Sequence, residues 1–133
     1  MILHIMSSSK IAFLLILCFF TIVFAQSGLD KVLDKKGNLN YLDSLLGAFF
    51  SGLLIRLAFY GVTVLELASG LFCLAGLVEC FFYGSSFFGL IGLVVGSLAL
   101  LVLLFGQRVS KNYDGAKTLV VYFILAMAGI VLS

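Results

Sequence analysis

Four long apolar runs, separated by more polar segments, constrain this chain more than any other feature. They cover about residues 11–29, 57–78, 87–105 and 118–132. The hydrocarbon core of a bilayer is about 30 Å thick, and roughly 20 residues of α-helix cross it. Lipid offers no hydrogen bonds to a backbone, so each run must satisfy its own N–H and C=O groups as a helix. We therefore predict an all-α membrane four-helix bundle in which consecutive helices run antiparallel.

Composition supports a membrane location and leaves little room for anything else. Apolar residues make up 63% of the 133 positions and charged residues 11%, against about 45–50% and 25% in soluble domains. Four spans use most of the length, so residues 1–133 are expected to form a single transmembrane domain. The net charge of +2 is small and forms no basic footprint of the kind that nucleic acid requires. The expected environment is the lipid bilayer, and no nucleic-acid partner is expected.

The first apolar run has two interpretations. Ile11 to Ala25 could be the core of a signal peptide that is cleaved after Ala25, or it could be a retained first span that continues to Leu29. Charge placement favours the retained span. With four spans, Lys10 lies on one side of the membrane and all other basic residues lie on the opposite side. Those are Lys31, Lys35, Lys36, Arg56, Arg108, Lys111 and Lys117. The positive-inside rule then places the two basic loops, 30–56 and 106–117, in the cytoplasm of a multi-pass protein.

The segment 30–56 is the only long one of mixed polarity. Its first part reads as a polar loop, and apolar residues then recur at helical spacing at Leu42, Leu45, Leu46 and Phe49. This spacing indicates either a short interfacial helix before the second span or an extension of that span, and both interpretations stay open.

Small residues line one face of the third predicted span. Gly89, Gly92 and Gly96 follow one another at spacings of three and four, and Gly92 with Gly96 forms a GxxxG pattern. Small residues let helix backbones approach closely in lipid, so we expect this face to pack against another helix. Packing within the bundle is favoured over the alternative, an interface of a homo-oligomer.

Glu66 is the most informative single residue, because it lies inside the second predicted span. A charge near the bilayer centre costs about 2.5–3.5 kcal/mol on insertion scales, so such groups face a protein interior and have a partner or a task. A neutral Glu66 could donate a hydrogen bond to a quinone or carbonyl oxygen, whereas an ionised one could bind a cation or pass a proton. The structural alternative is a tie to a neighbouring helix through Ser69, Tyr122 or a backbone carbonyl. Arg56 lies about 15 Å away along the helix, so it is not expected to be the partner within that span.

Other candidate residues carry weaker signals. Tyr122 in the fourth span could offer a hydroxyl toward the bundle, although helix packing is the favoured interpretation. Cys18, Cys73 and Cys80 show no CxxC spacing and are expected to act as small hydrophobic residues. His4 is the only histidine, so we predict no metal held by this chain alone and assign no catalytic residue.

Three short motifs carry a resemblance to a known family. Ser27-Gly28-Leu29-Asp30-Lys31 closes the first span and Leu65-Glu66-Leu67-Ala68-Ser69-Gly70-Leu71 lies in the second. Gly106-Gln107-Arg108-Val109-Ser110-Lys111-Asn112-Tyr113-Asp114-Gly115-Ala116 precedes the fourth. Together they resemble the DoxX-like family of small four-helix membrane proteins, and the likeness extends over nearly the whole chain.

The resemblance implies a bacterial cytoplasmic (inner) membrane protein in a family whose name-bearing members are subunits of a thiosulfate:quinone oxidoreductase or associate with membrane redox complexes. By position, Gly28, Lys31, Glu66 and Gly70 match the family's recurring residues. In the last polar segment, the matching residues are Arg108, Tyr113 and Gly115. The implied partners are other membrane or redox subunits. The chain itself is expected to hold no cofactor other than a quinone.

These observations lead to a subunit of a membrane redox or quinone-linked assembly as the expected function. A small proton-coupled transporter is the first alternative. Small multidrug exporters also have four helices and one essential carboxylate, but theirs lies in the first span, and Ile11 to Ala25 contains no acid. The second alternative is a non-catalytic scaffold or assembly factor, which would tolerate Glu66→Gln.

Overall fold

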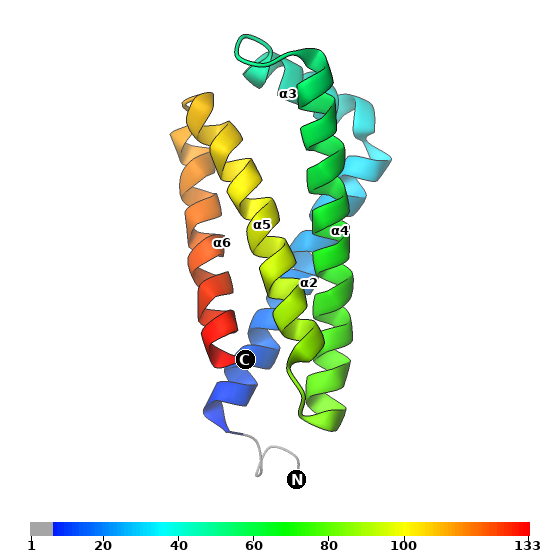
Figure 1. Cartoon of the computed structure of the whole chain (residues 1–133), viewed down its shortest axis with the longest axis vertical. Coiled ribbons are helices and arrows are strands. Elements are labelled where there is room, and N and C mark those ends of the chain that lie inside the picture. The colour runs from blue at the N-terminus through cyan, green and yellow to red at the C-terminus, as the bar shows by residue number, and fades with distance from the viewer. Residues whose placement is uncertain (1–6) are drawn as a thin grey trace.

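The computed structural model describes residues 7–133, and helices account for most of them (Figure 1). The helices are α2 (Ser8–Leu33), α3 (Lys35–Leu46), α4 (Gly52–Tyr83), α5 (Phe87–Val109) and α6 (Tyr113–Leu132). Four of them, α2, α4, α5 and α6, are long and apolar enough to cross a membrane. The predicted all-α membrane four-helix bundle is therefore confirmed.

The bundle is organised around α4. Helix α4 packs against both α2 and α5, and α6 packs against α5 and α2. Consecutive spans run in opposite directions, and α3 lies across the end of the bundle where α2 finishes (Figure 1). At the other end, Gly84 closes α4 with a left-handed backbone (φ 73°), a conformation that glycine adopts without steric penalty. Glu79 then accepts a hydrogen bond from the Phe88 backbone N–H at 2.9 Å and satisfies the first turn of α5.

The helices extend beyond the apolar runs that predicted them. Helix α2 continues to Leu33, so Lys31 lies within a helix and not in the expected loop. Asp34 ends α2 and caps α3, because its side chain accepts from the Gly37 N–H. The predicted helix was too short because hydropathy marks only where the lipid core ends. A helix without proline or a strong cap signal continues into polar sequence.

The two expected loops are also shorter than predicted. Within 30–56 the structure has a separate helix, α3, rather than a simple extension of α4, and Ser51 caps the new start of α4. Within 106–117, α5 continues to Val109 and α6 begins at Tyr113. Only residues 110–112 connect these two helices, which forces them to pack side by side.

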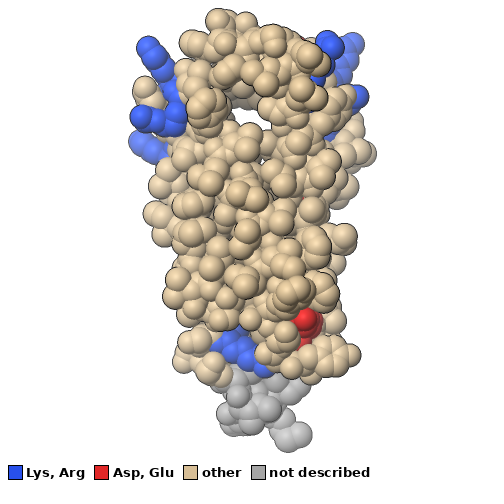
Figure 2. Space-filling model, viewed as in Figure 1, with Lys and Arg blue, Asp and Glu red and all other residues tan. Residues whose placement is uncertain are grey.

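Charged side chains gather at the two ends of the bundle (Figure 2). Most Lys and Arg residues lie on helices or connections at the end that carries α3, whereas Lys10 and Glu79 lie toward the opposite end. The basic residues other than Lys10 thus lie toward one end of the bundle.

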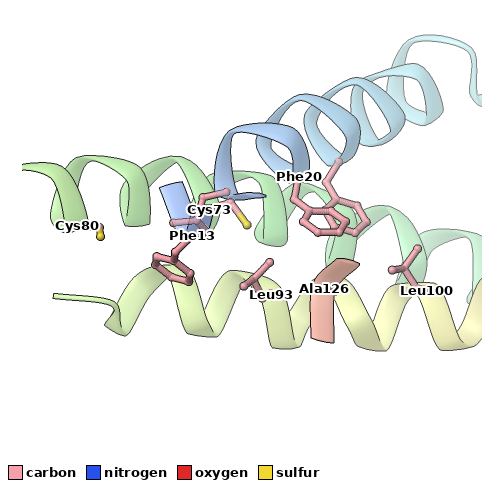
Figure 3. Close-up of a cluster of buried hydrophobic side chains, with 9 residues drawn as sticks. Phe13, Phe20, Cys73, Cys80, Leu93, Leu100 and Ala126 are labelled. Atoms are coloured by element: carbon pink, nitrogen blue, oxygen red, sulfur yellow. The ribbon is translucent and has the colours of Figure 1, made fainter. Parts of the chain in front are cut away.

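Aromatic and small residues fill the core (Figure 3). Helix α2 contributes four side chains, at spacings of four, three and four, that are almost completely buried: Phe13, Leu17, Phe20 and Phe24. They pack with Cys73 of α4, Leu93 and Leu100 of α5, and Ala126 of α6. Glycines let α4 and α5 approach each other closely, which leaves space in the centre of the bundle for the phenyl rings of α2.

Candidate functional site

Glu66 lies on the inner face of α4, surrounded by helices. Its side chain is 3% exposed, and the neighbouring α4 residues Val62, Thr63, Ser69 and Gly70 are buried as well. A carboxylate in such surroundings requires a partner, because burying an unpaired charge is among the most unfavourable events in folding.

The partner of Glu66 is Lys31 on α2. The Lys31 Nζ lies 2.7 Å from Glu66 Oε1, and the Lys31 side chain is 14% exposed. The same Nζ donates a hydrogen bond to Ser27 Oγ at 2.8 Å, one helical turn earlier. The Lys31–Glu66 contact is therefore a buried ion pair. The pair joins the end of α2 to the middle of α4.

Neither Ser69 nor Tyr122 forms a hydrogen bond with Glu66. Ser69 Oγ instead donates to the Gly92 carbonyl on α5 at 2.7 Å. Tyr122 packs edge-on against Phe19, with ring centroids 5.7 Å apart, and joins α6 to α2. Sequence reasoning missed the pairing because it placed Lys31 in a loop. The signal that could have found it was the Ser27–Lys31 spacing of one helical turn.

Two glycines bring α2 and α4 close enough for the ion pair to form. A side chain at Gly70 would begin 3.1 Å from the Ala25 backbone nitrogen. One at Gly28 would begin 2.5 Å from the Leu67 side chain. Gly28 and Gly70 therefore flank the crossing, and the first two motifs of the family resemblance form one contact region around Lys31 and Glu66.

A pocket of about 380 Å³ lies beside the ion pair, toward the α3 end of the bundle. Its walls come from the end of α2, from α3, and from the segments of α4 and α5 that extend past the end of α2. Figure 2 shows an opening through the surface in this region. The lining residues are Lys31, Asn38, Tyr41, Leu42, Leu45, Leu46, Phe50, Leu54, Ile55, Ala58, Phe59, Val62, Val102, Leu103, Phe105, Gly106 and Gln107.

Most of the pocket wall is apolar, with a few polar groups. Lys31 is the only charged residue among the described residues that line it, and Asn38, Tyr41 and Gln107 supply amide and hydroxyl groups. Gln107 Oε1 is buried without a hydrogen-bond partner in residues 7–133, and it lies against Gly115 of α6. An apolar cavity of this size with a few convergent polar groups is typical of a small-molecule site.

Arg108 and Tyr113 come together away from the ion pair. The Arg108 guanidinium lies 5.1 Å from the centre of the Tyr113 ring, where α5 turns into α6. This geometry is a cation–π contact. Neither residue lines the pocket, so the structure gives them a place at the junction of two helices at the basic end.

The glycines of α5 lie against α2 and α4. Side chains added at Gly89 and Gly96 would meet α2 residues, Leu17 and Phe24 respectively, while one at Gly92 would meet Cys73 of α4. This face is thus occupied within the bundle. It offers no open surface to a second copy of the chain.

Metal ligands are sparse in the described part of the chain. No group of three His, Cys, Asp or Glu side chains in residues 7–133 is placed to hold a metal ion. His4 lies outside the described residues. Cys18 is exposed, whereas Cys73 and Cys80 are buried.

Comparison with protein-family models, curated proteins and solved structures finds no match for this chain. The resemblance to the DoxX-like family therefore rests on the three sequence motifs.

Proposed function

We propose that this chain is a membrane subunit of a redox or quinone-linked assembly and that it binds a lipid-soluble quinone in the pocket between α3, α4 and α5. The observation that carries the proposal is the pocket itself. It has a volume of about 380 Å³, which falls within the range of about 300–1,000 Å³ for ligand sites. Its apolar walls suit an alkyl or isoprenoid tail, and Lys31 supplies a polar contact for a head group. The resemblance to the DoxX-like family supports the same function.

The proposal includes a location. The chain is a DoxX-like protein of the bacterial cytoplasmic membrane, with the α3 end, where the basic residues gather, in the cytoplasm. The pocket then opens near the cytoplasmic leaflet. Single cysteines in place of Lys36 and Ser86, in a Cys18→Ser background, test this orientation. A membrane-impermeant thiol reagent applied to intact cells should label position 86 and spare position 36, and the reverse pattern would contradict the orientation.

Purification from native cells tests the function. A tagged chain is extracted in mild detergent, co-purifying proteins are identified by mass spectrometry, and the bound lipid-soluble fraction is analysed for quinone. We expect an oxidoreductase subunit and bound quinone. A chain that comes out without either would contradict the proposal and favour a scaffold.

A matched pair of variants connects the quinone to the pocket. Ala58→Phe places a ring in the lining, whereas Leu57→Phe makes a similar change at the next residue, which is 60% exposed and does not line the pocket. We expect Ala58→Phe to abolish quinone recovery and Leu57→Phe to preserve it. Equal recovery from both variants would place the quinone elsewhere.

The proton-coupled transporter fits the geometry less well. A carrier of this kind needs a carboxylate that its cargo can reach. The Glu66 side chain is 3% exposed and lies against the Lys31 ammonium, and Glu66 is not part of the pocket lining.

A further inference from the structure

We propose that Lys31 is the residue that binds the ligand's head group, by donating one N–H to a carbonyl oxygen of a 1,4-quinone. Glu66 is a positioning residue, which holds the ammonium in place and cancels its charge. This inference rests on the proposed quinone site and assigns the residues that recognise the quinone there.

The Lys31 ammonium has one N–H donor more than the described residues use. An ammonium group has three N–H donors and no acceptor. Ser27 Oγ accepts one at 2.8 Å, and Glu66 Oε1 lies 2.7 Å from the same Nζ and accounts for a second. Within residues 7–133 the group has no third polar partner, and Lys31 lines the pocket. The remaining donor is therefore available to an oxygen atom of a ligand.

The neutral charge of the Lys31–Glu66 pair makes the pocket selective for uncharged ligands. Lys31 alone would make the pocket cationic and would favour fatty acids or anionic lipid head groups. Glu66 contacts the ammonium from outside the pocket, so the pair is neutral as a unit. An anionic ligand would leave one net negative charge in an apolar site, which is unfavourable. A neutral carbonyl oxygen accepts the hydrogen bond without that penalty.

Gln107 is a second polar residue in the lining of the same pocket. Its Oε1 is buried and has no hydrogen-bond partner in the described part of the chain. A buried unpaired acceptor of this kind is rare in folded proteins. The side-chain amide presents an acceptor or, after rotation, a donor. Gln107 also lines the pocket, so a quinol hydroxyl or quinone carbonyl that reached this amide would satisfy it, whereas an acyl chain would not.

The test compares a double variant with a matched control. Lys31→Met combined with Glu66→Met removes both charges at once, and replacing a buried ion pair by apolar residues is commonly neutral or stabilising, so the protein should fold. Lys35→Met removes a positive charge at the same end of the bundle from a residue that does not line the pocket. Binding of decyl-benzoquinone and decyl-naphthoquinone to the full chain in lipid nanodiscs is measured by calorimetry.

We expect the double variant to bind quinone roughly 10–100-fold more weakly, as for loss of a hydrogen bond from a charged donor, and Lys35→Met to bind as the unchanged protein does. The carbonyl stretching band of ¹³C-labelled quinone provides a second readout. It should lie at lower frequency in the unchanged protein than in the double variant. Equal affinity and an identical band in both proteins would overturn the assignment of Lys31 and leave the quinone site standing. Absence of quinone binding to the unchanged protein would overturn both proposals.

Glu66→Gln tests the selectivity. It keeps a side chain of the same shape beside Lys31 and leaves the ammonium charge uncompensated. We expect this variant to bind oleate roughly 10-fold more tightly than the unchanged protein, as for a new hydrogen bond between charged groups. Tight oleate binding by the unchanged protein, unaffected by Glu66→Gln, would show that the pocket accepts anions and would refute the role given to Glu66.

Discussion

The close approach of α4 and α5 leads to a quantitative prediction for Gly76. A Cβ atom added at Gly76 would lie 2.5 Å from both the Cα and the N atom of Gly89, and neither backbone atom can rotate away. Carbon atoms pack at about 3.5–4.0 Å, so the two helices would have to separate by roughly 1 Å. At Gly61 of the same helix, an added Cβ would have nothing within 4 Å. Gly61→Ala is therefore a matched control for Gly76→Ala.

Opposing effects determine the size of the change. Alanine favours a helix over glycine by about 1 kcal/mol at either position. Overpacking a close interface costs about 1–3 kcal/mol. We expect Gly61→Ala to be neutral or to stabilise by up to about 1 kcal/mol, and Gly76→Ala to destabilise by up to about 2 kcal/mol once the helix-propensity gain is subtracted from the overpacking cost. The midpoint of thermal unfolding should then be lower for Gly76→Ala by about 5–10 °C relative to the control.

The protein contains its own reporter for this measurement. Cys73 and Cys80 are buried, whereas Cys18 is exposed. In a Cys18→Ser background in detergent, a thiol-reactive fluorescent dye should react only as the bundle opens. A Gly76→Ala midpoint at or above that of Gly61→Ala would refute the close packing of α4 against α5.

The remaining predictions use the same assay. Lys31→Met alone leaves the Glu66 carboxylate buried without its partner and should destabilise the bundle by about 3–5 kcal/mol. Adding Glu66→Met should recover stability, and a double variant as unstable as Lys31→Met would contradict the pairing. Ser69→Ala removes the 2.7 Å hydrogen bond to the Gly92 carbonyl and should cost about 0.6–1.7 kcal/mol, so an unchanged midpoint would show that this bond contributes nothing. Glu79→Ala removes the side chain that satisfies the first turn of α5 and should destabilise by about 0.5–2 kcal/mol, while Glu79→Gln, which retains an acceptor, should preserve most of that stability.

The candidate site was only partly predictable. A carboxylate inside an apolar run made Glu66 a candidate on chemical grounds, because lipid does not tolerate an unpaired charge. Its partner could not be found in the same way. Hydropathy placed Lys31 in a polar loop, since the apolar run ends before it. The helix nevertheless continues to Leu33, which turns the Lys31 side chain toward α4.

The pocket was not predictable at all from local patterns. Its walls combine residues of α2, α3, α4 and α5 that are distant in sequence, and none of these segments shows a binding motif. The apolar spacing in 30–56 predicted a possible helix but not its position across the end of the bundle. That position follows from the turn at Asp34, which ends α2 while α4 and α5 extend further.

The sequence by itself determined the class of fold. Four apolar runs of membrane-spanning length leave helices as the only way to satisfy the backbone in lipid, and short connections require antiparallel neighbours. The tertiary structure decided which side chains meet. Gly28 and Gly70 let α2 cross α4 closely enough for Lys31 to reach Glu66, and the unequal helix lengths left the pocket beside them. Contacts of this kind depend on crossing points and helix ends, and those are set by packing between helices rather than by the pattern within any one of them.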